Sequence, residues 1–556
     1  MSTALNTRTV TPARPRPSFN GIAAGIVLFL LCAAGIWSID SLGINIPTLL
    51  NSFDNAVTFM GRMFPLDFPP LGEGIALIVE TLAIVFLATL LSVVLSLPVA
   101  LLAARPTTRG KMSQGAARTL IVLARAIPDL VLAIVFMRIF GLGATAGILA
   151  MGIHSIGMVA KLYGDAIEEL DDGPRQAMES VGASSRQQIW AAIPQKLLPQ
   201  IIATALHRFD INLRTSVLLG YVGIGGIGLA ISEALRVLDY QRGMALALIV
   251  LALCIVLEMI SGSIRKALMG RSGGGISGGT WVDRMLARKQ KPAAGDLRLS
   301  PPWTGDRITR FASALLILVL LVVSLRIVDI NWGEVIAGVP DIPATLALFF
   351  PPSAGGAWEA LLEALILTIQ IALAATLIGA VLALPIGVLA ARNVVRNPYA
   401  HSFFRGVIVV VRGIPELILA ILFVVISGLG GIAGTLALSV GAVGLLSKLV
   451  ADSLEETDTA VQEAQRATGA SDIQVFFSAT LRQAAPAFIA HTMYLLDTNI
   501  RSATLLGVVG AGGVGFLLLN ASRINQFDVV TMILILMVGV VLLVELLSMW
   551  LRRTVR

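Results

Sequence analysis

Asp210-Ile211-Asn212-Leu213-Arg214 returns 287 positions later as Asp497-Thr498-Asn499-Ile500-Arg501. The same shift aligns Arg125-Ala126-Ile127-Pro128-Asp129-Leu130 with Arg412-Gly413-Ile414-Pro415-Glu416-Leu417, and no gap separates the two alignments. A repeat of this length is far longer than the units of about 20–50 residues that build solenoids. The chain therefore predicts two complete domains of one fold in a single polypeptide.

The composition favours a protein that crosses a membrane many times. The chain is 56% hydrophobic and 13% charged, whereas soluble domains carry about 25% charged residues. Its apolar runs reach the roughly 20 residues that a helix needs to cross a bilayer. The net charge of +7 comes from basic residues in the flanks and loops of these runs, as the positive-inside rule expects. This placement argues against nucleic-acid binding.

Each half predicts six membrane-spanning helices, about twelve in all. The spans of the first half are 20–39, 74–102, 117–140, 142–160, 200–220 and 242–263. Those of the second half are 309–328, 361–389, 404–427, 429–447, 487–507 and 529–550. An even number returns the chain to the side it left, so the two repeats run parallel about an axis along the membrane normal.

The predicted organisation follows from these spans and from the charges between them. We expect a cytoplasmic basic tail at 1–19, a first domain at 20–269 with its core at 74–269, a cytoplasmic linker at 270–305, and a second domain at 306–556 with its core at 361–556. The acidic segments 40–73 and 329–360 are expected outside. Both termini and the polar loops 161–199 and 448–486 are expected in the cytoplasm.

The two long polar loops carry one motif, in which a helical stretch, a glycine and a second helical stretch follow one another. Its residues are Gln176, Ala177, Gly182, Ala183 and Ser184 in the first half, and Glu463, Ala464, Gly469, Ala470 and Ser471 in the second. Glycine suits such a corner because it adopts positive φ without penalty. A short exposed helix of this kind can fit a groove on a partner, and its recurrence in both halves disfavours an ordinary loop.

Charged residues inside the spans are candidates for a translocation pathway, because burying them in a membrane is costly. The charged candidates are taken together with the asparagine that lies between each aspartate and arginine. The full set is Asp210, Asn212, Arg214, Asp497, Asn499 and Arg501. Each arginine lies roughly 20 Å into its span. One interpretation is an i,i+4 ion pair with the preceding aspartate that neutralises itself. The other is that the arginines bind the oxygens of an anionic substrate. Both stay open.

Arg125 and Arg412 precede Ile-Pro, at Pro128 and Pro415. Proline removes a backbone donor and can kink a helix, so we predict a gate or a helix-packing role for these four residues. The glycine patterns at 223–228 and 510–515 spell a dinucleotide fingerprint. That fingerprint requires a preceding strand, and here it follows a membrane span twice.

The polar-loop motif resembles the "EAA" signature of ABC importer permeases. With the Arg-x-Ile-Pro-Asp/Glu-Leu element and the stretch 499–515, most of each half resembles a phosphonate-type ABC permease. The resemblance implies an all-α type I importer fold in the cytoplasmic (inner) membrane. It also implies coupling helices that dock on two separate ATPase subunits, an extracytoplasmic binding protein, and a phosphonate, phosphite or phosphate substrate. Gln176 in place of the glutamate, the missing second alanine and the fusion of two domains depart from the family pattern.

No Walker A motif lies in the chain, so we expect no cofactor and no catalytic or metal site here. ATP and Mg²⁺ are expected in the partner ATPase subunits. One rival is a twelve-helix secondary transporter of an anionic solute, which needs no docking loop on its cytoplasmic face. Another is a membrane enzyme, which needs a cluster of His, Cys or carboxylate residues at the membrane surface.

Overall fold

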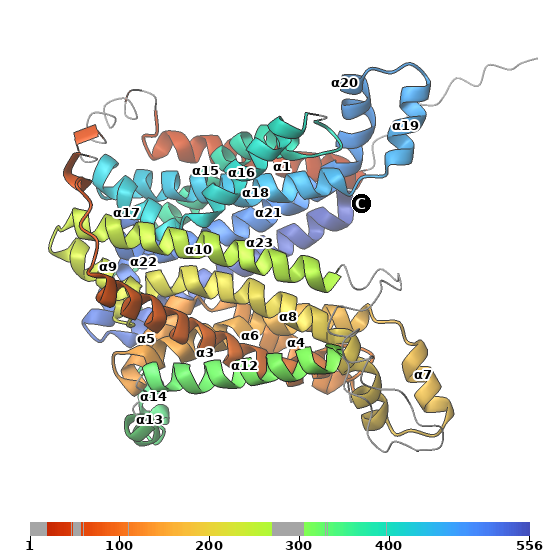
Figure 1. The fold of residues 1–556 in the computed structure, drawn as a ribbon. Coiled ribbons are helices and arrows are strands. Elements are labelled where there is room, and N and C mark those ends of the chain that lie inside the picture. The colour runs from red at the N-terminus through yellow and green to blue at the C-terminus, as the bar shows by residue number, and fades with distance from the viewer. Residues whose placement is uncertain are drawn as a thin grey trace, which may run out of the picture.

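The computed structural model describes residues 19–45, 47, 57–58, 61–108, 110–269, 305–328, 330, 332–395 and 397–555. Every regular element in these ranges is a helix (Figure 1), which confirms the all-α class. The predicted tail up to residue 18 and the predicted linker from 270 to 304 lie outside the described residues. Below, the first half means residues 19–269 and the second half residues 305–555.

The two halves repeat one order of helices. The first half contains α1 (Phe19–Ser41), α3 (Leu71–Ala103), α4 (Lys111–Ala126), α5 (Asp129–Phe140), α6 (Ala144–Glu168), α7 (Gly173–Ser180), α8 (Ser185–Leu219), η1 (Gly220–Val222), α9 (Ile227–Arg236) and α10 (Tyr240–Met269). The second half contains α12 (Gly305–Ile327), α13 (Trp332–Gly338), α14 (Ile342–Ala347), α15 (Trp358–Ala390), α16 (Pro398–Gly413), α17 (Glu416–Ser427), α18 (Gly431–Glu455), α19 (Thr459–Ala467), α20 (Asp472–Val475), η2 (Phe476–Thr480), α21 (Leu481–Leu506), η3 (Gly507–Ala511), α22 (Val514–Arg523) and α23 (Phe527–Val555).

The predicted spans all fall on apolar helices. Within the described ranges, seven helices are long and apolar enough to cross a membrane, and the number reaches eleven if each bent helix pair is one span. The remaining predicted span, 309–328, falls on the shorter apolar helix Phe311–Ile327. Length and composition therefore agree with a polytopic membrane protein.

Two of the predicted spans are pairs of helices rather than single rods. The span at 117–140 is α4 and α5, which meet at 91°, and the span at 404–427 is α16 and α17, which meet at 80°. Pro128 and Pro415 occupy the N-cap positions of α5 and α17 with extended backbone. Proline lacks the amide that would continue the helix, and it forces the preceding residue out of the α region. The kink that proline can introduce at Ile-Pro is present in both halves.

The glycine-rich corners after α8 and α21 bring two backbones into direct contact. A Cβ atom on Gly220 would lie 2.1 Å from the carbonyl carbon of Gly228, and one on Gly515 would lie 1.7 Å from the carbonyl oxygen of Thr504. Any side chain there would clash with backbone. These glycines thus permit close packing of a span against the short helix that follows it.

Threonines on the long helices α3 and α15 anchor the same corners. The amide of Ile227, at the start of α9, donates to Oγ1 of Thr81 over 2.9 Å. The amide of Val514, at the start of α22, donates to Oγ1 of Thr368 over the same distance. Because the first amides of a helix have no partner within it, these buried hydroxyls satisfy donors that lipid could not.

The first helix of each half lies on the other half. Helix α1 packs along α15, and α12 packs along α3, as Figure 1 shows. The contact is close, since a Cβ atom on Gly35 would lie 2.9 Å from Cδ2 of Leu377. The limits 20–269 and 306–556 therefore follow the order of the chain, whereas each packed bundle combines helices from both halves.

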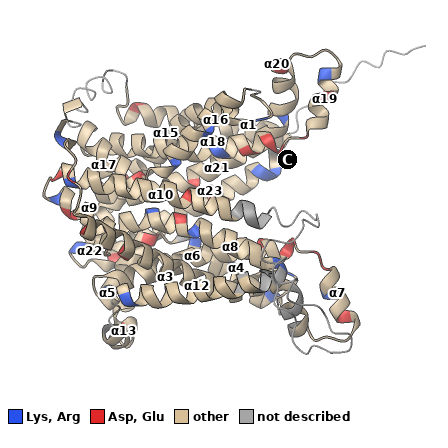
Figure 2. Cartoon of the chain, viewed as in Figure 1, with Lys and Arg blue, Asp and Glu red and all other residues tan. Residues whose placement is uncertain are grey.

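Hydrophobic side chains cover the outside of the helical bundle as well as its core. One apolar core contains residues of both halves, including Leu213 and Ile500. On the outer helices Phe29 is 71% and Leu315 61% exposed. Figure 2 shows that many of the charged residues gather towards the two ends, and that a smaller group lies near α10 and α23. A broad apolar belt of this kind suits a bilayer.

Replacing Gly220 with alanine tests the packing of the glycine corner. The added methyl group would overlap the backbone of Gly228, and overpacking typically costs about 1–3 kcal/mol. We expect Gly220→Ala to lower the unfolding temperature of the detergent-purified protein by several degrees. Gly262→Ala is the matched control, since a Cβ there meets nothing within 4 Å. Equal unfolding temperatures for the two variants would contradict this account of the corner.

Candidate functional site

The polar loop of the first half folds as predicted, with a helix, a glycine corner and a second helix. We call residues 173–188 the first elbow. Gly182 has φ +79°, and a Cβ on it would meet nothing within 4 Å, so its backbone conformation rather than space requires glycine. Gln176 and Ala177 are exposed on α7. Ser184 caps α8, and its amide donates to Oε1 of Gln187 over 2.8 Å.

The second elbow, residues 459–480, has the same order of elements. Gly469 has φ +86°, Glu463 and Ala464 are exposed on α19, and Ala470 is half-buried. The amide of Ser471, the N-cap of α20, donates to Oε1 of Gln474 over 2.9 Å. The helix–glycine–helix pattern predicted for both loops is confirmed.

Among the side chains that the structure describes, the internal contacts of the two elbows differ. In the second elbow the hydroxyl of Ser478 donates to Oε1 of Gln465 over 2.6 Å. Arg466 on α19 pairs with Asp472 on α20 at 3.2 Å. In the first elbow the ion pair of Arg175 with Asp172, at 3.0 Å, lies within a single turn. The second elbow is thus braced across its corner by side chains.

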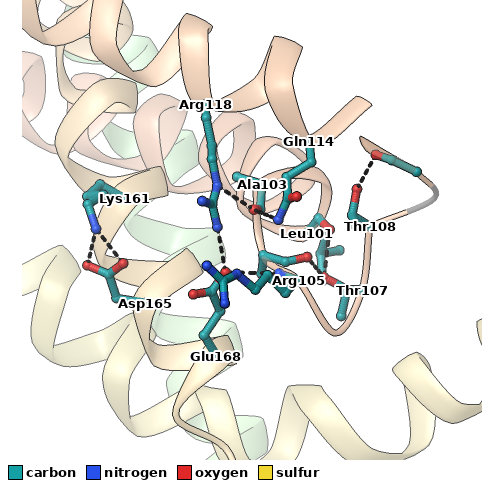
Figure 3. A network of polar contacts seen from close by, with 12 residues as sticks. Leu101, Ala103, Arg105, Thr107, Thr108, Gln114, Arg118, Lys161, Asp165 and Glu168 are labelled. Atoms are coloured by element: carbon teal, nitrogen blue, oxygen red, sulfur yellow. Dashed lines mark hydrogen bonds and ion pairs between the residues drawn. The ribbon is translucent and has the colours of Figure 1, made fainter. Parts of the chain in front are cut away.

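A polar network ties the first elbow to the helical bundle (Figure 3). Oε1 of Glu168, the last residue of α6, accepts from Nη2 of Arg118 over 2.7 Å and from the amide of Arg105 over 2.9 Å. Nε of Arg118 also donates to the carbonyl of Ala103 over 3.1 Å. Since α7 begins a few residues after α6 ends, the network joins the elbow to α3 and α4.

The second half repeats this network. Oε1 of Glu455 accepts from Nη2 of Arg405 over 2.8 Å and from the amide of Arg392 over 2.9 Å. Sequence reasoning missed these residues. The signal was present, because the shift of 287 positions carries Arg118 onto Arg405 and Glu168 onto Glu455.

The arginines before Ile-Pro form ion pairs that cross between the halves. Nη1 of Arg412, at the end of α16, lies 3.0 Å from Oε1 of Glu258 on α10. Nη1 of Arg125, at the end of α4, lies 3.5 Å from Oε1 of Glu545 on α23. The four side chains are 11–30% exposed. We call these the two cross-half ion pairs.

Glycines seat both arginines against the neighbouring helix of their own half. A Cβ atom on Gly157 of α6 would lie 2.9 Å from the backbone nitrogen of Arg125. A Cβ on Gly444 of α18 would lie 3.0 Å from that of Arg412. A side chain at either glycine would force the neighbouring backbone to shift, so the turn that carries each arginine lies directly on helix backbone.

The predicted pathway arginines join the same clusters. Nη2 of Arg214 lies 2.9 Å from Oδ2 of Asp210 and 3.5 Å from Oε2 of Glu258. Arg501 pairs with Asp497, and its Nη1 donates to the carbonyl of Arg125 over 3.3 Å. The i,i+4 ion pair that we weighed from sequence is therefore present in both halves. The two arginine side chains are 24% and 22% exposed.

The two asparagines predicted beside the pathway are buried in a helix contact. Nδ2 of Asn212 donates to Oγ1 of Thr89 over 3.0 Å, and Nδ2 of Asn499 donates to Oγ1 of Thr376 over 2.9 Å. Asn212 is 0% and Asn499 2% exposed. The structure thus places their amides between α8 and α3 and between α21 and α15.

One buried arginine has no counterpart in the other half, and sequence reasoning missed it. Arg208 on α8 is 4% exposed, and its Nε donates to Oγ of Ser155 over 2.6 Å. Within the described ranges its Nη2 has no hydrogen-bond partner. The shift of 287 positions places Leu495 opposite it. A search for charged residues that recur in both halves therefore misses Arg208. Its position inside a predicted membrane span could have identified it, because charged residues are rare there.

Comparison with known proteins agrees with this duplicated geometry. Residues 96–270 and 383–556 each match the family described as "Binding-protein-dependent transport system inner membrane component". Phosphate-import permease protein PhnE of Mycolicibacterium smegmatis is 39% identical over 93% of this chain and 91% of its own length. Phosphite transport system permease protein PtxC of Stutzerimonas stutzeri is 36% identical over 44% of this chain and 86% of its own length. A solved inward-facing MetNI methionine ABC transporter is 27% identical over 37% of this chain and 99% of that chain, with a TM-score of 0.34. The chain belongs to the family of binding-protein-dependent transport system inner membrane components and carries one such domain in each half.

Proposed function

We propose that this protein is the fused permease of an ATP-driven importer for a phosphonate or a related oxyanion, phosphite or phosphate. The observation that carries the proposal is the pair of exposed elbows at one end of a duplicated helical bundle. The substrate class is supported by relatives named as phosphate-import and phosphite transport permeases.

The elbows are the docking surfaces for two separate ATPase subunits, which bind ATP and Mg²⁺. They present apolar side chains to solvent, with Val181 76%, Ile473 72% and Phe477 61% exposed. Exposed apolar groups on a short helix suit a groove on a partner. The elbow end is then cytoplasmic, as are both termini, and a binding protein approaches the opposite end, where α9 and α22 lie (Figure 1).

The structure offers a continuous route from an elbow to the cross-half ion pairs. Glu168 binds Arg118 on α4, and Arg125 at the far end of the same helix pairs with Glu545 of the other half. Movement of an elbow with its ATPase subunit would displace α4 and lengthen this pair. We propose that the two cross-half ion pairs form a gate which opens and closes during transport.

The gate and the pathway share a carboxylate. Glu258 holds both Arg214 and Arg412. When the halves separate, Arg214 loses one of its two carboxylate partners and can offer a guanidinium edge to the substrate, whose oxygens accept two parallel hydrogen bonds. Arg214 and Arg501, each with its aspartate, are thus the proposed pathway residues, while Asn212 and Asn499 hold the helices that carry them.

Placing arginine at Ala177 and Ala464 tests the docking role. Both alanines are exposed, so we expect the double variant to fold but to lose co-purification with its ATPase subunits, together with substrate uptake. The matched control is Ala347→Arg, an exposed position on α14 at the opposite end, which should keep ATPase binding. Uptake that persists without bound ATPase would support the secondary transporter instead.

Neutralising Glu258 tests the gate. Glu258→Gln removes the charge that Arg412 and Arg214 share, so we expect uptake to fall at least tenfold and substrate stimulation of ATPase activity to decrease. A double-mutant cycle with Arg412→Gln should give a coupling free energy of about 0.5–3 kcal/mol in thermal unfolding, as for contacting residues. Glu363→Gln removes an exposed carboxylate and should change neither quantity. Additive effects in the cycle would refute the ion pair as an energetic unit.

Replacing both pathway arginines tests their part in transport. In Arg214→Gln with Arg501→Gln we expect uptake by proteoliposomes to be lost while the complex still assembles and hydrolyses ATP at its basal rate. Arg553→Gln, at an exposed position near the end of α23, controls for loss of positive charge. Unchanged uptake in the double variant would remove these arginines from the pathway.

A further inference from the structure

A cavity of about 360 Å³ lies between the two halves at the end opposite the elbows. It is lined by residues of η1, α9 and α10 of the first half and of α17, η3 and α22 of the second half. None of the residues that we inferred from sequence to bind substrate lies in it. Its volume falls within the range of about 300–1,000 Å³ typical of small-molecule sites.

Two arginines related by the repeat line this cavity. Arg236 ends α9 and Arg523 ends α22, and the shift of 287 positions carries one onto the other. Among the cavity-lining residues that the structure describes, they are the only charged ones. With two cations and no carboxylate among these residues, the cavity attracts anions.

Both guanidinium groups keep donors for a ligand. Nη2 of Arg236 donates to the carbonyl of Tyr221 over 3.1 Å. The other N–H groups of its guanidinium remain available to a ligand. Arg523 makes no side-chain hydrogen bond or ion pair with any residue that the structure describes. Both residues are exposed, so they lie where the cavity meets the surface and can contact an anion as it enters.

Two buried hydroxyls in the cavity wall have no partner. Ser232 is 0% exposed, and its Oγ has no hydrogen-bond partner in the described part of the chain. The same holds for the buried Oη of Tyr221. A buried hydroxyl without a partner is unfavourable, and buried polar groups usually find one. Both residues line the cavity, so a molecule inside it can supply the missing bonds once the side chains that cover the two hydroxyls move aside.

The cavity is asymmetric although it lies between two related halves. Val508 and Leu519 occupy the positions of Tyr221 and Ser232 in the second half, so both hydroxyls come from the first. Asn520 of the second half also lines the cavity. Two symmetric cations with hydroxyls on one side only define a single site for one ligand in one orientation.

We propose that this cavity captures one small phosphorus oxyanion on the side that faces the binding protein, before the anion reaches Arg214 and Arg501. The two arginines bind its charged oxygens in the geometry that guanidinium groups favour, and Ser232 and Tyr221 orient it by hydrogen bonds. This inference rests on the proposed function for the class of substrate. The site itself is distinct from the ion pairs of the gate.

The test is binding of radiolabelled inorganic phosphate, phosphite and methylphosphonate to the permease–ATPase complex in lipid nanodiscs without the binding protein. We expect the double variant Arg236→Gln with Arg523→Gln to weaken binding at least tenfold, since a charge-assisted hydrogen bond contributes about that factor. Tyr221→Phe and Ser232→Ala should each weaken it several-fold. Arg62→Gln, which removes an exposed arginine that does not line the cavity, should leave it unchanged.

Uptake by the complete system, with its binding protein, separates this inference from the proposed function. If the wild-type system takes up none of the three oxyanions, the proposed function fails. If it takes them up, but the complex binds none of them or binds them equally well without Arg236 and Arg523, the capture site alone is overturned. Unchanged binding in Tyr221→Phe and Ser232→Ala would mean that these hydroxyls do not contact the anion, and it would overturn their part in the site.

Discussion

The cost of holding charge inside an apolar bundle governs the centre of this molecule. An ionised side chain within a membrane must pair with an opposite charge or meet water. Arg412 finds Glu258 and Arg125 finds Glu545, and in both pairs the partner belongs to the other half. The interaction that neutralises each arginine is therefore also a contact between the two halves.

Close packing makes these pairs possible. Gly157 and Gly444 let the arginine-bearing turns lie on neighbouring backbone, and Thr81 and Thr368 satisfy the first amides of α9 and α22. In the core of a bilayer no water is present to accept hydrogen bonds from these amides. Small residues and hydroxyls thus serve the packing that places each charge opposite its partner, in agreement with their general use between membrane helices.

The two halves share a fold but differ where they meet a ligand or a partner. The second elbow is braced by Arg466 and Ser478, whereas Arg208 and the hydroxyls of Tyr221 and Ser232 belong to the first half alone. Fusion of two domains in one chain allows such differences, because each copy always meets the other and can specialise. A substrate that passes between the two halves would then contact different side chains on its two sides.

The sequence alone determined the duplication, the apolar spans, the helix breaks at Pro128 and Pro415 and the helix–glycine–helix elbows, because periodicity, proline and glycine act through local backbone geometry. It also indicated that Arg214 and Arg501 lie near Asp210 and Asp497, since i,i+4 spacing needs no tertiary contact. Only the tertiary structure decided that α1 lies on α15, that Glu258 serves arginines from both halves, and that Arg236 and Arg523 meet at one cavity. These contacts join residues far apart in the chain, and their partners are chosen by how the helices pack, which no local pattern records.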